Sequence, residues 1–329
     1  MKKALFSFLF VFAGVFVFLF VGFPGPREDV EWGVNFSEKH AQAFGLNWSQ
    51  AYLALLDDLE VKLVKTAFHW DIVEPEPGLF RFDDFDFQVR EAEARGVSIV
   101  PVIGQKTSRW PECHTPEWAK QLSKEDQQAA ILTMLRVVVG RYKDSPSVLF
   151  WQVENEPFFP FGECLWADEK FLAEEVKLVK SLDQNHSVMI TDSGEGSLWV
   201  AAARYGDIVG ATMYRKVWFR QLNRYLTYPF SPTFYQRKAW LINLFFHKPV
   251  IGAELQAEPW GPKLLYDISL DEMKKTMTPE QFEANIDFAA KSGFSTHYLW
   301  GAEWWYWMKE KQGDDSYWEL ARSLFGSGD

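Results

Sequence analysis

The sequence has few of the residues on which metal, thiol or cofactor chemistry depends. Its 329 residues include only two cysteines, Cys113 and Cys164, and six histidines. The histidines show no H-x-x-H or H-E-x-x-H spacing and the cysteines no C-x-x-C spacing, so the sequence predicts no metal site. It also has no G-x-G-x-x-G or Walker-type loop for nucleotide phosphates. We therefore expect no cofactor.

The sequence also lacks an excess of positive charge, flexible linkers and internal repeats. The net charge of −11 argues against a nucleic-acid partner. No Ser/Pro/Gly-rich tract or solenoid repeat interrupts the chain, and nothing in it indicates an oligomeric state. Tryptophan, in contrast, is abundant, with 16 residues. Its flat apolar face and polar N–H suit contact with sugar rings, although core packing is its ordinary role.

The N-terminus carries the only long hydrophobic run. Lys2 and Lys3 precede an apolar stretch from Ala4 to Phe23, and about 20 such residues can span a bilayer as a helix. The segment ends without the A-x-A site of a cleaved signal peptide, which favours an uncleaved membrane anchor. A signal peptide remains the alternative. Either would export the rest of the chain. We expect 1–24 to be signal or anchor, 25–30 a short stalk and 31–329 the folded domain.

Eight strand-then-helix cycles follow, a pattern that predicts parallel strands joined by crossover helices. About three hundred residues in eight cycles are typical of a (β/α)8 TIM barrel, an α/β fold. The expected strands are 32–36, 63–67, 98–103, 148–153, 188–191, 208–213, 250–253 and 296–300. The expected helices are 51–59, 84–95, 123–142, 168–182, 198–205, 235–246, one starting after Thr278, and 317–325.

Two glutamates stand at the ends of expected strands. The run Trp151-Gln152-Val153-Glu154-Asn155-Glu156-Pro157 closes the fourth, and Lys248-Pro249-Val250-Ile251-Gly252-Ala253-Glu254 closes the seventh. In such barrels the chemistry lies on the loops after the strands. The fourth and seventh strands lie across the barrel mouth from each other, so we expect Glu156 and Glu254 to face one another.

These motifs resemble clan A of the glycoside hydrolases, most closely the family 5 cellulase and mannanase type. Asn155-Glu156-Pro157 is the most specific element, and the segment 70–83 is similar to a loop of several clan A families, including the family 42 β-galactosidases. The resemblance spans about residues 31–325. It implies a retaining glycosidase with Glu156 as acid/base and Glu254 as nucleophile, and it implies that Asn155 binds the sugar 2-hydroxyl.

The chemistry explains why two carboxyl groups are needed. A glycosidic bond breaks through an oxocarbenium-like transition state that requires a proton on the leaving oxygen and negative charge beneath the anomeric carbon. Retaining enzymes place the two carboxyl groups about 5–5.5 Å apart, one as nucleophile and one as acid and then base. Their pKa values must differ, with that of the acid raised by burial and by its neighbour's charge.

Glu258 competes with Glu254 for the nucleophile's role. A strand that begins after Pro249 and has about five residues ends at Glu254. This favours Glu254 and places Glu258 in a loop at the rim. Glu154 shares a strand face with Glu156 by the two-residue period. It is expected either to point into the mouth toward Lys65 or His69, or to be a solvated or structural carboxylate.

Other residues are expected to lie near the substrate. By resemblance, Tyr214 hydrogen-bonds the nucleophile and Trp300 forms the floor beneath the sugar. His69, Trp70 and Trp110 follow the second and third strands and are cleft candidates. For each aromatic residue the alternative is core packing.

The pattern departs from family 5 at one position. Family 5 members carry an arginine at the second strand that supports the nucleophile, and none can be placed there in this sequence. Lys65 or His69 would have to substitute, which leaves the family within the clan open.

Two long loops carry further expectations. Cys113 and Cys164 follow neighbouring strands on one face of the barrel, so a disulfide between them is expected, with two free thiols as the alternative. The segment 214–248 is long for a connection that usually has about 2–6 residues, and it is rich in aromatic and basic residues. For 218–234 we expect a lid over the cleft, with a membrane-facing surface as the alternative.

The expected substrate is an oligo- or polysaccharide. Endo-acting hydrolysis of a β-linked glucan or mannan is the first hypothesis, and an exo-acting β-glycosidase is the second. Transglycosylation on the same two glutamates and a carbohydrate-binding pseudoenzyme anchored in the envelope are alternatives. The presence of both glutamates argues against the pseudoenzyme.

Overall fold

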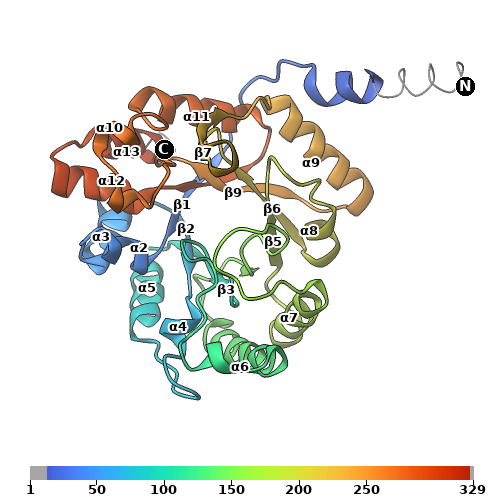
Figure 1. Ribbon diagram of the computed structural model, residues 1–329, viewed down its shortest axis with the longest axis vertical. Coiled ribbons are helices and arrows are strands. Elements are labelled where there is room, and N and C mark those ends of the chain that lie inside the picture. Colours follow the sequence, from blue (N-terminus) through green and yellow to red (C-terminus); the bar gives the residue numbers. More distant parts are fainter. Residues whose placement is uncertain (1–12, 327–329) are drawn as a thin grey trace, which may run out of the picture.

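The computed structural model describes residues 13–326, which form a closed eight-stranded parallel barrel surrounded by helices (Figure 1). The strand order around the barrel is β1-β10-β9-β6-β5-β4-β3-β2. The barrel strands are β1 (Glu31–Phe36), β2 (Leu63–Ala67), β3 (Ser98–Ile103), β4 (Trp151–Val153), β5 (Val188–Asp192), β6 (Ile208–Met213), β9 (Val250–Gln256) and β10 (Thr296–Trp300). The predicted (β/α)8 barrel is confirmed.

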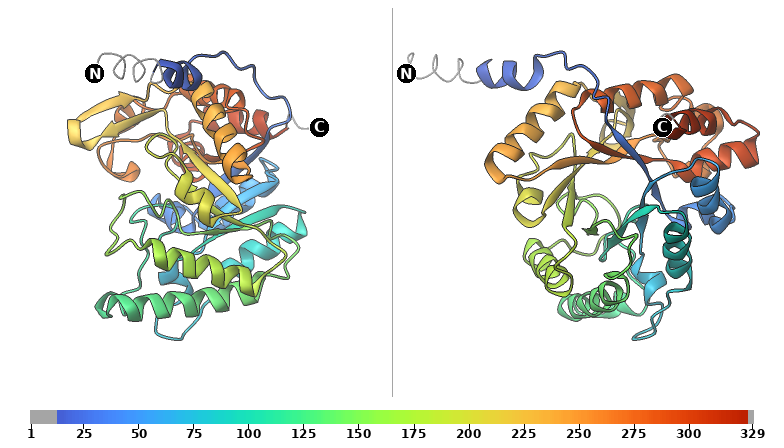
Figure 2. Two further views of the ribbon diagram at one scale, coloured as in Figure 1. Left: turned by 90° about the vertical axis from the view of Figure 1, so that its right-hand side faces the viewer. Right: turned by 180° about the vertical axis from the view of Figure 1, so that it is seen from behind.

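The larger helices form the outer ring, and short ones line the loops (Figure 2). The α-helices are α2 (Glu38–Ala43), α3 (Trp48–Asp57), α4 (Trp70–Val73), α5 (Asp83–Ala94), α6 (Lys124–Tyr142), α7 (Glu169–Leu182), α8 (Val200–Tyr205), α9 (Pro232–Phe246), α10 (Leu270–Met273), α11 (Pro279–Lys291), α12 (Ala302–Trp307) and α13 (Ser316–Gly326). The other turns of helix are η1 (Ala119–Gln121), η2 (Arg220–Leu222), η3 (Leu265–Asp267) and η4 (Met308–Gln312).

Local signals in the sequence set several helix starts. Ser123 caps α6 by accepting a hydrogen bond from the backbone N–H of Asp126, and Thr278 caps α11 in the same way, with Pro279 in the first turn. Such caps satisfy N–H groups that the helix itself leaves unpaired. The fourth strand begins later than predicted, at Trp151, because Val148 makes only an isolated bridge to Ile99.

Two apolar clusters hold the barrel together. The larger lies between the strands and the outer helices and includes Trp151, Trp199 and Trp305, which are fully buried. The smaller contains Val100, Phe150, Met189, Ile251, Ala253 and Tyr298 from alternating strand positions. Since successive side chains of a strand point to opposite faces, this second set fills the barrel interior and supports the mouth from below.

The N-terminal segment lies outside the barrel. Residues 13–20 are helical, and the chain then runs across the outside to β1 (Figure 2). Within residues 13–326, none of the helices has the length and apolar character needed to cross a membrane. Residues 1–12 of the expected signal or anchor helix lie outside the described part of the chain.

The long connection between β6 and α9 contains a hairpin that the sequence did not suggest. Strands β7 (Lys216–Phe219) and β8 (Arg224–Thr227) pair antiparallel, with Trp218 opposite Tyr225. The hairpin is joined to the loop after β9, because the backbone N–H of Trp218 donates to the carbonyl of Trp260. This hairpin occupies the first half of the segment expected to form a lid.

Candidate active site

The loop after β4 positions Glu156 through an unusual backbone. Glu154 and Glu156 both adopt left-handed conformations, with φ of 58° and 42°. Non-glycine residues rarely adopt these angles, and such strain is concentrated at functional sites. The backbone N–H of Glu156 donates to the Thr191 hydroxyl, and the Thr212 hydroxyl donates to Glu156 Oε1 at 3.0 Å. Residues from β5 and β6 therefore fix both the backbone and the carboxyl group of Glu156.

A register shift in β9 positions Glu254. Ile251 and Ala253 belong to the interior cluster, so strict alternation would turn Glu254 outward. Pairing with β6, however, steps from Gly252 to Glu254, which inserts one extra residue at Ala253. Such a bulge re-aims the side chains that follow it. Gly252 is required beside it, because a Cβ there would lie 2.0 Å from His297 Nδ1.

Glu254 lies between a hydroxyl donor and a buried lysine. The Tyr214 hydroxyl donates to Glu254 Oε2 at 2.7 Å, and Lys65 Nζ lies 3.6 Å from Glu254 Oε1. Glu254 is 2% exposed, and its Oε1 accepts no hydrogen bond from the described residues. Of the two residues considered as substitutes for the family 5 arginine, Lys65 therefore lies beside Glu254, whereas His69 bonds the hydroxyls of Ser37 and Thr107. A hydroxyl and an ammonium group both stabilise the ionised form of the carboxyl group.

The surroundings of Glu156 favour its neutral form. Burial, followed by the negative charge of Glu254, raises the pKa of Glu156 well above its usual range. Lys106 opposes this shift, and its ammonium group donates to the backbone carbonyls of Glu156 and Phe159 at 2.9 Å each. The two predicted residues therefore come together as an electrostatically unequal pair, in which the pKa of Glu156 is raised and Glu254 contacts the Tyr214 hydroxyl and Lys65.

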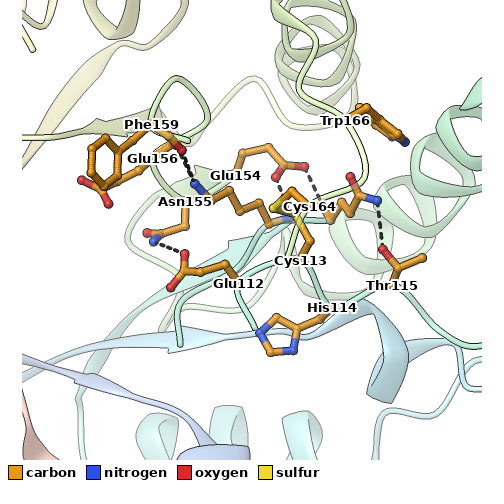
Figure 3. Close-up of a disulfide and its surroundings, with 12 residues drawn as sticks. Glu112, Cys113, His114, Thr115, Glu154, Asn155, Glu156, Phe159, Cys164 and Trp166 are labelled. Atoms are coloured by element: carbon orange, nitrogen blue, oxygen red, sulfur yellow. Dashed lines mark hydrogen bonds between the residues drawn. A yellow bond between two sulfur atoms is a disulfide. The ribbon is translucent and has the colours of Figure 1, made fainter. Parts of the chain in front are cut away.

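A third carboxyl group, which the sequence analysis did not identify, lies beside this pair. Glu112 accepts a hydrogen bond from Asn155 Nδ2 at 3.2 Å (Figure 3). The pKa of Glu112 is raised to about 8, mainly by burial and in addition by the charge of Glu254, while Lys106, Asn155 and Lys65 act against the shift. Glu112 also has a left-handed backbone, with φ of 72°. Nothing in the local sequence distinguishes this glutamate from solvated ones.

Glu154 does not point into the mouth, contrary to one expectation. Its side chain points away from that of Glu156 (Figure 3) and accepts hydrogen bonds from the backbone N–H groups of Gln105 and Lys106 at 2.7 and 2.6 Å. The left-handed backbone breaks the two-residue alternation on which that expectation rested. Glu154 also forms a hydrogen bond with Glu175. Burial and the charge of Glu154 raise the pKa of Glu175 well above its usual range. Glu154 therefore joins the loops after β3 and β4.

Glu258 lies in the loop after β9, as expected, although the strand continues two residues beyond Glu254 to Gln256. It is 5% exposed and forms an ion pair with Arg109, whose other nitrogen pairs with Glu303 at 2.6 Å. The Arg109 guanidinium also stacks on Trp300, with 4.0 Å between the guanidinium carbon and the ring centroid. Arg109 follows β3 and its partners follow β9 and β10, so this side chain reaches across the barrel mouth.

The same cluster offers the one grouping of possible metal ligands found among residues 13–326. Ligand atoms of His40, Glu258 and Glu303 lie within 4.8 Å of one another. The Arg109 guanidinium already pairs with both carboxylates. An ion-pair network therefore accounts for this cluster without a cation.

Three expected cleft residues have different environments. Trp70 is fully buried in the main core, where its N–H donates to Glu74, so the expectation that it lines the cleft was wrong. His69 is also fully buried and bonds the hydroxyls of Ser37 and Thr107, so it supports the loops rather than the substrate. Trp110 is 43% exposed and contacts Phe161 edge-on.

Cys113 and Cys164 form a disulfide, with a Cα–Cα separation of 5.1 Å (Figure 3). It joins the loops after β3 and β4, the same loops that Glu154 connects. A cavity of about 270 Å³ lies beside the loop after β4, and the residues that line it include Glu154, Trp166 and Glu175. Neither Glu156 nor Glu254 lines this cavity.

Comparison with known proteins places the chain among carbohydrate-active enzymes. The family described as "Glycosyl hydrolases family 2, TIM barrel domain" matches residues 82–260. The probable mannan endo-1,4-beta-mannosidase A of Aspergillus flavus is 29% identical over 194 residues, which cover 54% of this chain and 47% of that protein. This chain thus spans about half the length of that relative.

Solved structures share the fold at low identity. The hyperthermostable endo-1,4-beta-D-mannanase of Thermotoga petrophila aligns with a TM-score of 0.56 at 15% identity, covering 91% of this chain and 99% of that one. The beta-galactosidase of Halorubrum lacusprofundi aligns with a TM-score of 0.59 at 15% identity, covering 91% of this chain and 58% of that one.

We predict that Glu112→Gln reduces the pH dependence of stability. The folded protein retains the Glu112 proton up to about pH 8, whereas the unfolded chain releases it near the usual pKa of 4.5. This group's contribution is therefore fully present below pH 4.5 and is lost as the pH rises toward 8. Melting temperatures measured from pH 5 to 8 should fall less in the variant than in the natural protein.

The control is Glu117→Gln, which removes an exposed carboxylate from the same loop. It should leave the slope of melting temperature against pH unchanged. Equal slopes in Glu112→Gln and the natural protein would show that Glu112 is ionised in the folded state.

Proposed function

We propose that this chain, which belongs to the glycosyl hydrolase family 2 TIM-barrel domain family and so to the clan expected from its motifs, is a retaining glycoside hydrolase. In this proposal Glu156 is the acid/base and Glu254 is the nucleophile. One observation carries the assignment of roles. Tyr214 and Lys65 stabilise the ionised form of Glu254, whereas burial and the Glu254 charge keep the proton on Glu156. An acid and an anionic nucleophile are what double displacement requires.

The same electrostatics supports the second half of the reaction. When Glu254 attacks the anomeric carbon, Glu156 donates its proton to the leaving oxygen and Glu254 loses its charge in the covalent intermediate. One cause of the raised pKa of Glu156 is then removed, since that cause is the Glu254 carboxylate. With its pKa lowered, Glu156 can accept a proton from the incoming water. Hydrolysis releases the sugar and restores the first state.

The substrate we propose is a β-linked mannan or glucan. The curated relative from Aspergillus flavus is named a mannan endo-1,4-beta-mannosidase, and the structural neighbours include a mannanase. Asn155 is the proposed contact to the sugar 2-hydroxyl, and its amide is oriented by Glu112 and Gln152. Trp300 is the proposed floor and Trp110 a contact farther out.

We further propose that the domain acts outside the cytoplasm. The disulfide between Cys113 and Cys164 suits an oxidising compartment. The lysines and apolar run at the N-terminus suit export, either as a signal peptide or as an anchor.

Substitution of the acid/base and of the nucleophile should give different kinetic signatures. Glu156→Ala should lower turnover of natural glycosides by about 10²–10⁴-fold, the usual contribution of a general acid. It should affect a dinitrophenyl glycoside far less in the step that forms the covalent intermediate, since that leaving group needs no proton. Azide should restore turnover and yield a glycosyl azide with retained configuration.

Glu254→Ala should abolish activity on both kinds of substrate, and azide should then yield the product of inverted configuration. Glu258→Ala is the comparison, because Glu258 was the competing candidate. Substantial activity in Glu254→Ala together with none in Glu258→Ala would show that the nucleophile is misassigned.

Exo-acting hydrolysis is a second candidate that one observation favours. Arg109 reaches across the mouth to Glu258 and Glu303 and lies on one face of Trp300. A side chain in that position closes a cleft into a pocket, and a pocket accepts a chain end more readily than the middle of a polymer.

The first products formed from mannohexaose should distinguish the two modes. Under the exo candidate a single product size accumulates from the non-reducing end while the viscosity of mannan hardly falls. Products of mixed size with an early fall in viscosity would exclude the exo candidate and leave the endo-acting enzyme.

A further inference from the structure

The outer face of α9 is apolar where a polar surface is expected. Trp240, Leu244 and Phe245 are 50%, 47% and 69% exposed, whereas Phe234 and Ile242 on the opposite side of the helix pack into the core. A helix that covers a barrel normally presents polar residues to water. Contiguous exposed apolar residues usually mark a surface that another molecule covers.

The N-terminal segment extends this apolar face. The Phe18 ring lies 5.6 Å from the Trp240 ring, and the Phe20 ring stacks on Phe234 at 5.3 Å. Two segments far apart in the sequence thus lie side by side at the edge of the molecule (Figure 1). The exposed apolar residues of the N-terminal segment are Val15, Phe16, Val17, Val21 and Phe23, each more than half exposed. We call this set and the three residues of α9 the α9 surface.

A basic residue lies at the α9 surface. The Arg237 guanidinium is 5.1 Å from the Phe18 ring centroid. The helix α9 itself, from Pro232 to Phe246, contains no aspartate or glutamate. In a chain with a net charge of −11, an apolar surface with a basic and no acidic residue on its helix favours an anionic partner.

We propose that the α9 surface rests on an anionic phospholipid bilayer. Exposed tryptophan, phenylalanine and leucine together with arginine and lysine are the composition of helices that lie in the membrane interface. Its N-terminal residues, from Val15 to Phe23, also belong in the sequence to the apolar run that follows Lys2 and Lys3, and this favours lipid over a protein partner. This inference does not depend on the catalytic roles of Glu156 and Glu254.

The position of the surface is compatible with catalysis. Helix α9 belongs to the outer ring of helices (Figure 2). Glu156 instead follows β4 and Glu254 lies near the C-terminal end of β9, at the barrel mouth. A bilayer against α9 therefore leaves the mouth open from the side, and the substrate can reach it along the membrane surface.

Fluorescence quenching by lipid tests the contact directly. The full chain is mixed with vesicles of phosphatidylcholine and phosphatidylglycerol in which the acyl chains carry bromine. If Trp240 enters the bilayer, the bromine should quench part of the tryptophan fluorescence of the natural protein. This quenched component should be missing from Trp240→Phe. Trp110→Phe is the matched control, because Trp110 is similarly exposed, at 43%, but lies on a mouth loop. It should keep that component.

A pair of double variants tests the rest of the surface. The double variant Leu244→Glu with Phe245→Glu should abolish the quenching of Trp240. It should also weaken partition of the protein into these vesicles, by about a hundredfold where the N-terminal segment alone does not keep the chain on the vesicle. Leu79→Glu with Leu149→Glu, at exposed positions on other elements, should change neither reading. If Trp240→Phe lacks no quenched component, or if both double variants behave like the natural protein, the α9 surface does not contact lipid.

Discussion

The contact of Tyr214 and Lys65 with Glu254 is the interaction on which the rest of the site depends. A carboxylate with 2% of its surface exposed is costly to ionise, and these two groups stabilise its charge. Burial is the main cause of the raised pKa values of Glu156 and Glu112, and the negative charge of Glu254 acts in the same direction on both. The Glu254 carboxylate therefore adds to the effect of burial on two neighbouring carboxyl groups, and the proposed roles of acid and nucleophile rest on this difference in environment.

The loop after β3 is the second constraint. It is tied to the loop after β4 by the disulfide of Cys113 and by the carboxylate of Glu154, and it reaches across the mouth through Arg109. These ties fix Glu112 beside Asn155. The loop thus contributes both the third carboxyl group of the site and the side chain that contacts the loops after β9 and β10 across the mouth, so we expect the size of accepted substrates to depend on it.

Much of the fold could be predicted from the sequence, because strand and helix periodicity and the caps at Ser123 and Thr278 are local signals. The position of Glu156 after the fourth barrel strand could be predicted in the same way, as could that of Glu254 near the end of the seventh, which continues to Gln256. What could not be predicted depends on three-dimensional detail. The bulge at Ala253 and the left-handed backbone at Glu154 break the alternation used to orient side chains. The contacts of Arg109 join loops about 150 and 190 residues apart in the chain.

Trapping the covalent intermediate tests the central claim most directly. An activated 2-deoxy-2-fluoro-β-mannoside or glucoside slows the second step of a retaining enzyme, so the sugar stays attached to the nucleophile. Trypsin does not cleave between Lys248 and Pro249, so Glu254 and Glu258 lie in the same tryptic peptide, which ends at Lys263. This peptide must therefore be fragmented in the mass spectrometer to show which glutamate carries the sugar. The account predicts one sugar on Glu254 and none in Glu254→Gln. A sugar on Glu258 or Glu156, or hydrolysis with inversion and no labelled residue, would contradict it.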